Sequence, residues 1–133
     1  MKKAGLISIM LIIAFAISTS VFATNTRASD QLIKYSANAN IDEGNINVVV
    51  YVLGGIDVTK AGCEKLKIYK KVGSSWISYI SLDEDDTDMS VNSQTYLHTH
   101  QFAAIDGVEY KVDVTIFAEN DGGRDTRDFT FYI

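Results

Sequence analysis

Hydrophobic and polar residues alternate with a period of two in several segments of the chain. In Val108–Ala118 every second residue from Val108 is apolar, whereas positions 109, 111, 113 and 115 are polar. A helix would scatter both sets around its circumference, so this pattern predicts a β-strand. Ile33–Ile41 alternates in the same way. Ile46–Leu53 is apolar at both sets of positions, which predicts a central strand.

Turn residues separate the predicted strands. Gly54-Gly55 ends the second strand, and Gly73-Ser74-Ser75 predicts a hairpin. Only Asp57–Ala61 has a pattern that could form a single helical turn. About seven strands of this kind predict an all-β fold, an antiparallel immunoglobulin-like β-sandwich. The predicted strands are Ile33–Ile41, Ile46–Leu53, Lys65–Val72, Trp76–Leu82, Thr95–Ala103, Val108–Ala118 and Thr126–Ile133.

Tyr110 lies near the start of an alternating strand and directly follows the turn signal Asp106-Gly107. This arrangement is typical of the tyrosine corner of immunoglobulin-like domains, in which the hydroxyl bonds to backbone a few residues upstream. Val112 stands where antibody domains carry a cysteine. The pattern therefore favours the disulfide-free, fibronectin-type branch and gives Tyr110 a structural role.

The first 23 residues have the three parts of a secretory signal peptide. Lys2 and Lys3 precede the uncharged segment Ala4–Ile17, and Val21-Phe22-Ala23 places small or medium residues at the −3 and −1 positions of a cleavage site. We expect this signal-peptide helix to be cleaved between Ala23 and Thr24, because an uncharged segment of 14 residues is too short to span a bilayer. Residues 24–133 then form one secreted, extracellular β-sandwich domain without a transmembrane segment.

Removal of the signal peptide changes the charge. The whole chain has a formal charge of −5, and loss of Lys2 and Lys3 leaves ten basic residues against 17 acidic ones, a net −7. Such an acidic domain is a poor partner for nucleic acid or an anionic membrane. The chain has no proline and one cysteine, so an intramolecular disulfide is excluded.

Short segments spread over the chain resemble those of known proteins. They comprise a lysine-rich signal peptide, Tyr35-Ser36-Ala37, Lys67-Ile68-Tyr69-Lys70, Trp76, Gly107-x-x-Tyr110-Lys111 and Gly122-Gly123-x-Asp125-Thr126-Arg127. In these segments the chain resembles a group of small secreted proteins of Gram-positive bacteria to which no function is assigned. The resemblance implies an immunoglobulin-like fold and no activity.

An acidic run between two predicted strands is a candidate calcium site. Calcium binds carboxylate oxygens, but the run lacks the glycine and the final glutamate of the EF-hand template. A looser site between strands or a solvated acidic loop are the two interpretations. The candidate ligands are Asp83, Asp85, Asp86 and Asp88.

His98 and His100 share one face of a predicted strand and have a spacing that two zinc ligands can use. Zinc needs a third protein ligand, and Tyr96 and Phe102 flank the pair on the same face. The alternative is a pair of partly buried, hydrogen-bonded imidazoles, which would make stability depend on pH.

Cys63 is interpreted as a small buried hydrophobic residue, with an intermolecular disulfide as the alternative. We therefore expect a monomer, or a Cys63-linked dimer. A polar loop near the C-terminus is a candidate binding loop, and internal Arg–Asp pairing is its alternative. Its residues are Asp121, Arg124, Asp125 and Arg127.

No catalytic constellation or cofactor motif is found, so we expect a protein that is not an enzyme. The leading hypothesis is a binding module whose partner is a protein or glycan at or outside the bacterial cell envelope. The alternative is a small secreted antagonistic, bacteriocin-like or signalling polypeptide.

Overall fold

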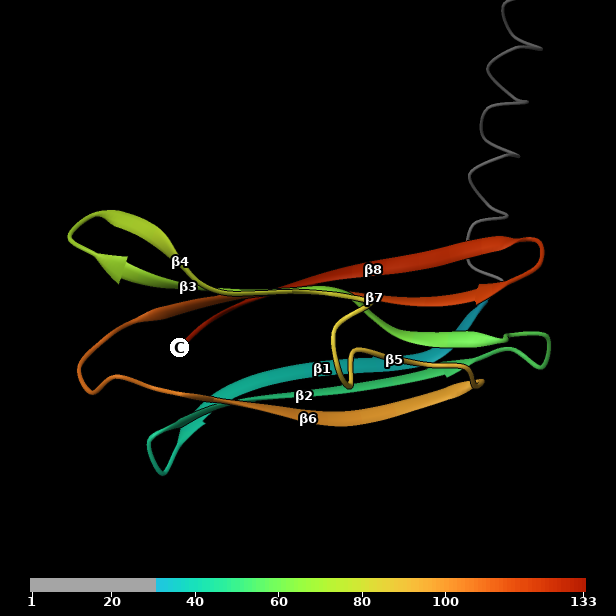
Figure 1. Ribbon diagram of the computed structural model, residues 1–133, viewed down its shortest axis with the longest axis horizontal. Coiled ribbons are helices and arrows are strands. Elements are labelled where there is room, and N and C mark those ends of the chain that lie inside the picture. The colour runs from blue at the N-terminus through green and yellow to red at the C-terminus, as the bar shows by residue number, and fades with distance from the viewer. Residues whose placement is uncertain (1–30) are drawn as a thin grey trace, which may run out of the picture.

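The computed structural model describes residues 31–133, so the predicted signal peptide and the Ala23–Thr24 cleavage site lie outside the described residues. Figure 1 shows the described residues as two layers of antiparallel strands. The strands are β1 (Leu32–Asp42), β2 (Asn45–Gly54), β3 (Lys60–Val72), β4 (Ser75–Asp83), β5 (Ser90–Val91), β6 (Thr95–Ala103), β7 (Tyr110–Asn120) and β8 (Gly123–Tyr132). All seven predicted strands are confirmed, and the two-residue β5 is additional.

One sheet has the order β1-β2-β6 and the other has the order β4-β3-β7-β8, with β5 paired to β3. These orders correspond to sheets A-B-E and C′-C-F-G in the strand letters used for immunoglobulin-like sandwiches. Residues 31–133 therefore form an all-β, antiparallel sandwich, as the sequence predicts. The prediction that β2 is central is also confirmed.

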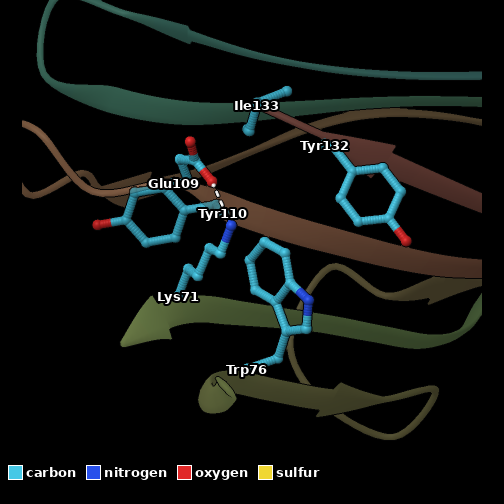
Figure 2. A pocket seen from close by; sticks show the side chains of 6 residues that line it. All are labelled: Lys71, Trp76, Glu109, Tyr110, Tyr132 and Ile133. Carbon is cyan, nitrogen blue, oxygen red and sulfur yellow. Dashed lines mark ion pairs between the residues drawn. The ribbon is translucent and has the colours of Figure 1, made fainter. Parts of the chain in front are cut away.

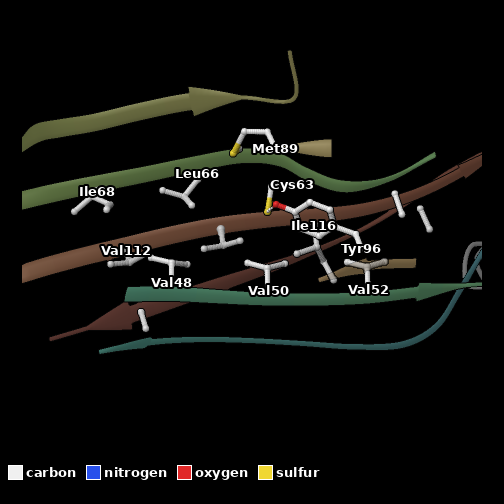
Figure 3. Close-up of a cluster of buried hydrophobic side chains, with 14 of the residues drawn as sticks. Val48, Val50, Val52, Cys63, Leu66, Ile68, Met89, Tyr96, Val112 and Ile116 are labelled. Carbon is white, nitrogen blue, oxygen red and sulfur yellow. Dashed lines mark hydrogen bonds between the residues drawn. The ribbon is translucent and has the colours of Figure 1, made fainter. Parts of the chain in front are cut away.

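The core lies between the sheets (Figure 3). The inward side chains Ile46, Val48, Val50 and Val52 of β2 have no exposed surface, and the residues of β3 and β7 that face them are also buried. Valine and isoleucine supply most of this core because their branched β-carbons suit a pleated surface. The facing residues are Cys63, Leu66 and Ile68 on β3 and Val112, Val114 and Ile116 on β7.

Short turns connect neighbouring strands. β1 and β2 are joined by Glu43 and Gly44, which both have positive φ, of 50° and 76°. Two such residues form the hairpin turn whose twist matches that of the flanking strands. The predicted hairpin at Gly73-Ser74-Ser75 is confirmed, since Val72 pairs with Ser75.

Tyr110 forms the predicted tyrosine corner. Its side chain is fully buried, and its hydroxyl accepts a 2.8 Å hydrogen bond from the backbone N–H of Ile105. The hydroxyl thus satisfies a backbone donor in the β6–β7 connection. The structural role expected for Tyr110 is confirmed.

Two details of the prediction are wrong. Asp57–Ala61 contains no helical turn, because Thr59 N–H donates to Glu119 O and β3 already begins at Lys60. The regular inward face predicted for β1 also fails. Pairing with β2 is irregular between Leu32 and Lys34, so that Leu32 is buried while Ile33 is 64% exposed on this edge strand.

Candidate functional site

Aromatic and lysine side chains gather on the outer face of the β4-β3-β7-β8 sheet. Pairing of the strands aligns Lys71 with Trp76, and it aligns Lys111 with both Tyr69 and Tyr132. Because neighbouring strands lie about 5 Å apart, these five side chains form one continuous patch. We call it the aromatic–lysine surface, formed by Tyr69, Lys71, Trp76, Lys111 and Tyr132.

The rings and ammonium groups of this surface contact one another. The ring centroids of Trp76 and Tyr132 are 5.9 Å apart and tilted by 51°. The Lys111 Nζ lies 4.6 Å from the Tyr69 ring centroid and 5.9 Å from that of Trp76. Such cation–π contacts hold the lysine between the rings while its ammonium group keeps access to solvent.

A pocket of about 350 Å³ opens at one end of the aromatic–lysine surface (Figure 2). Trp76 and Tyr132 line it, and Lys71 forms a 3.3 Å ion pair with Glu109 beside them. Tyr110 and Ile133 form the rest of the lining, and two backbone hydrogen bonds between them hold the end of the chain on β7. Tyr132, on the outer face, is 69% exposed.

This arrangement offers stacking surfaces with hydrogen-bonding groups close by. Small-molecule sites in proteins combine aromatic lining with a few placed polar groups in the same way. Lys71 and Lys111 supply donors, and Glu109 supplies an acceptor. The surface is therefore suited to a ligand that has both apolar faces and hydroxyl or amide groups.

The two histidines proposed as zinc ligands lie at a buried row of polar side chains that is centred on the Tyr96 hydroxyl. His98 and His100 have ring centroids 4.5 Å apart, but His100 is only 6% exposed and its Nε2 lies 2.8 Å from the Tyr96 hydroxyl. That hydroxyl also lies 2.6 Å from the Asp88 carbonyl oxygen. Since the carbonyl can only accept, the hydroxyl donates to it and accepts a hydrogen bond from His100 Nε2–H.

Burial lowers the pKa of His100 to about 4, and the neighbouring His98 contributes to the shift. The Nε2 of His100 is already hydrogen-bonded to the Tyr96 hydroxyl. His98 is partly exposed, with its Nε2 3.9 Å from the Asp88 carboxylate. Of the two imidazoles, His100 is thus buried and hydrogen-bonded, whereas His98 is partly exposed and only near a carboxylate.

Cys63 lies at the other end of this row of polar side chains, with its Sγ 4.0 Å from the Tyr96 hydroxyl. It has no exposed surface, and burial raises the pKa of its thiol to about 12. The thiolate is the reactive form of cysteine, so the folded protein holds Cys63 in its unreactive form. A disulfide to a second copy would require β3 to open first.

The four aspartates proposed for calcium are spread around the β4–β5 loop. Asp83 and Asp86 use carboxylate oxygens to accept backbone N–H groups of Asp85 and Asp83. Within residues 31–133, no three acidic, histidine or cysteine side chains come together as a group that could hold a metal ion. The loop is instead shaped by its own hydrogen bonds.

Glu84, in the same loop, pairs with two basic residues of the outer face. Its carboxylate accepts from Arg124 at 2.9 and 3.0 Å and from Lys60 at 2.9 Å. The hydrogen bond from Arg124, followed by that from Lys60, lowers the pKa of Glu84 to about 2. Arg124 also contacts Glu119 at 2.9 Å and Glu64 at 3.4 Å.

The four residues of the predicted binding loop do not form one surface. Arg124 lies over Phe117 on the outer face, whereas Asp125 is buried and accepts the Gln31 N–H at 2.9 Å. Arg127 lies 5.7 Å from the Tyr35 ring, and Asp121 is exposed in the turn. Neighbouring residues of a strand point to opposite faces, which separates Arg124 from Asp125.

The sequence interpretation did not identify the aromatic–lysine surface. Alternation in Val108–Ala118 already placed Lys111 on the outer face, and Trp76 directly followed the predicted hairpin. The sequence alone does not give the order of the strands in the sheet, and this order brings Tyr69 and Tyr132 to either side of Lys111.

The fold places the chain among antiparallel β-sandwiches with fibronectin-type strand order. No protein-family model matches the chain, and neither does any curated protein. In the part of the chain that the structure describes, no helix has the length and apolar character needed to span a membrane.

Proposed function

We propose that this protein is a secreted, non-catalytic binding module that recognises a glycan at or outside the cell envelope. The aromatic–lysine surface is its contact site. The observation that carries the proposal is the pair Trp76 and Tyr132, whose rings meet at 5.9 Å beside an open pocket. Secretion is the expectation from the sequence of residues 1–23.

A glycan fits this site better than an apolar protein surface would. Sugar rings present C–H faces that can lie on aromatic rings, and their hydroxyl groups both donate and accept hydrogen bonds. The pocket provides each of these partners, since Trp76 and Tyr132 are aromatic, Lys71 donates and Glu109 accepts.

The test is binding of the purified domain to bacterial cell-wall sacculi, compared among three proteins. Trp76→Ala removes an aromatic side chain that lines the pocket, and we expect at least tenfold weaker binding, a loss of about 1.4 kcal/mol. Ile77→Ala is the matched control because Ile77 is the next residue of β4 and does not line the pocket. It should bind as the unmodified protein does.

Equal binding by Trp76→Ala and the unmodified domain would contradict the proposal, as would a lack of binding to sacculi. Thermal melting of each variant checks that the sandwich remains folded. If the domain inhibits bacterial growth, and the Trp76→Ala variant inhibits it equally, the antagonistic polypeptide is favoured instead.

A further inference from the structure

A second pocket lies on the same outer face as the aromatic–lysine surface. It also has a volume of about 350 Å³ and is formed by side chains of β3, β7 and β8. Its polar lining consists of Lys65, Lys67, Asp113, Thr115, Asp128 and Thr130.

Strand pairing places the two pockets in line. The row Tyr69, Lys111 and Tyr132 is followed by the row Lys67, Asp113 and Thr130. The next row contains Lys65, Thr115 and Asp128. Successive rows are two residues apart, which is about 7 Å, so Lys71 in the first pocket and Lys65 in the second are about 20 Å apart along β3.

The polar groups of the second pocket are fixed in position. Thr130 Oγ1 donates to Asp113 Oδ1 at 2.8 Å, and Thr115 Oγ1 donates to Asp128 Oδ1 at 2.6 Å. Each hydrogen bond occupies one oxygen of its carboxylate, and a carboxylate has further acceptor positions. The lysines beside them are donors, so each row presents a donor and an acceptor to a ligand.

The balance of charges favours an uncharged ligand. Two lysines, Lys65 and Lys67, and two aspartates, Asp113 and Asp128, line the pocket, so their charges cancel. An anionic chain would gain no net attraction there, because repulsion from the carboxylates offsets attraction to the lysines. A neutral chain of hydroxyl-bearing units could use the lysines and the carboxylates together.

We infer that the second pocket is a further subsite for the same glycan, and that the ligand is a linear, uncharged oligosaccharide lying along β3 and β7. The inference rests on the proposed function, because the first subsite is the aromatic–lysine surface. A chain too short to reach from Trp76 to Lys67 would occupy only the first subsite.

The experiment measures affinity for neutral oligosaccharides of two and six units, using β-1,4-linked N-acetylglucosamine, β-1,4-linked glucose and α-1,4-linked glucose. A hexamer of galacturonic acid is the anionic comparison. We expect one neutral hexamer to bind at least tenfold more tightly than its dimer. Lys67→Ala combined with Asp113→Ala should reduce this hexamer affinity to that of the dimer and leave dimer binding unchanged.

Trp76→Ala should weaken the dimer and the hexamer equally, which separates the two subsites. Asp42→Ala, on the other sheet, is the control and should change neither affinity. Equal affinity for the dimer and the hexamer would overturn the second subsite. Tighter binding of the galacturonic acid hexamer than of the neutral hexamers would overturn the uncharged ligand. Neither result would contradict binding at the aromatic–lysine surface. Binding to sacculi without binding to any neutral oligosaccharide would also overturn it, and binding to neither would overturn both proposals.

Discussion

The guanidinium group of Arg124 lies 4.0 Å from the centroid of the Phe117 ring and covers it on the outer face of β7. Phe117 has no exposed surface although it does not belong to the core between the sheets. Lys60 lies 5.8 Å from the same ring, and Glu84 bonds to both basic residues. One aromatic ring and one ionic cluster thus attach the acidic β4–β5 loop to the β7–β8 hairpin.

Replacing Arg124 with methionine should destabilise the domain by about 1–2 kcal/mol, because Glu84, Glu64 and Glu119 lose their shared partner. The side chains are partly exposed, which limits the loss. Urea unfolding of the variant measures this free energy directly. Arg124→Lys is the control and should lose less, since it keeps the charge but cannot bond in bidentate fashion. Equal stability of all three proteins would contradict the role assigned to Arg124.

Acidification should destabilise the domain through His100. Its pKa is about 4 in the folded protein and 6.5 as an ordinary value, so the unfolded chain binds the proton more readily. Stability contributed by neutral His100 is therefore complete above pH 6.5 and falls as the pH is lowered to about 4, by at most about 1.4 kcal/mol per pH unit.

The measurement is the free energy of unfolding between pH 7 and pH 4. His100→Gln should flatten this part of the profile. His98→Gln keeps the buried imidazole and should retain most of the slope, since burial is the larger cause of the lowered pKa and His98 the smaller one. Below pH 4.5 Glu84 adds a separate loss, because the unfolded chain takes up a proton on this carboxylate whereas the folded protein, in which its pKa is lowered to about 2, keeps it ionised. A slope that His100→Gln leaves unaltered would show that another group titrates.

Tyr110→Phe should lower the free energy of unfolding by about 1–3 kcal/mol, because the Ile105 N–H loses its acceptor inside the fold. Chemical denaturation measures the effect. Tyr132→Phe is the matched control, since its side chain is 69% exposed and stability should be unchanged. Equal stability of Tyr110→Phe and the unmodified protein would indicate that water replaces the hydroxyl.

Cys63 should resist thiol reagents in the folded protein, because its side chain is fully buried and the pKa of its thiol is raised to about 12. Reaction with a chromogenic disulfide at pH 8 should be slow in buffer and rapid in 6 M guanidinium chloride. The same samples on a non-reducing gel should show monomer. Rapid labelling in buffer would mean that β3 opens often.

Much of the fold follows from local patterns. A period of two requires only that alternate residues point to opposite faces, and it predicted the strands at Ile33–Ile41 and Val108–Ala118. The apolar run Ile46–Leu53 and the turn residues between segments predicted the others. The hairpin at Gly73-Ser74-Ser75 and the corner at Tyr110 depend on neighbouring residues and were predicted for the same reason. The irregular pairing of β1 could not be predicted, because a bulge depends on the partner strand as well as on its own sequence.

The sequence by itself determined the all-β class, the strand positions and the residues that can face outward. Only the tertiary structure decided which of those residues meet. Tyr69 and Lys111 are far apart in the chain, as are Glu84 and Arg124, and they become neighbours through the sheet order β4-β3-β7-β8 and the path of the β4–β5 loop. Register and strand order arise from packing between distant segments, so a surface built across four strands appears only when the sheet is assembled.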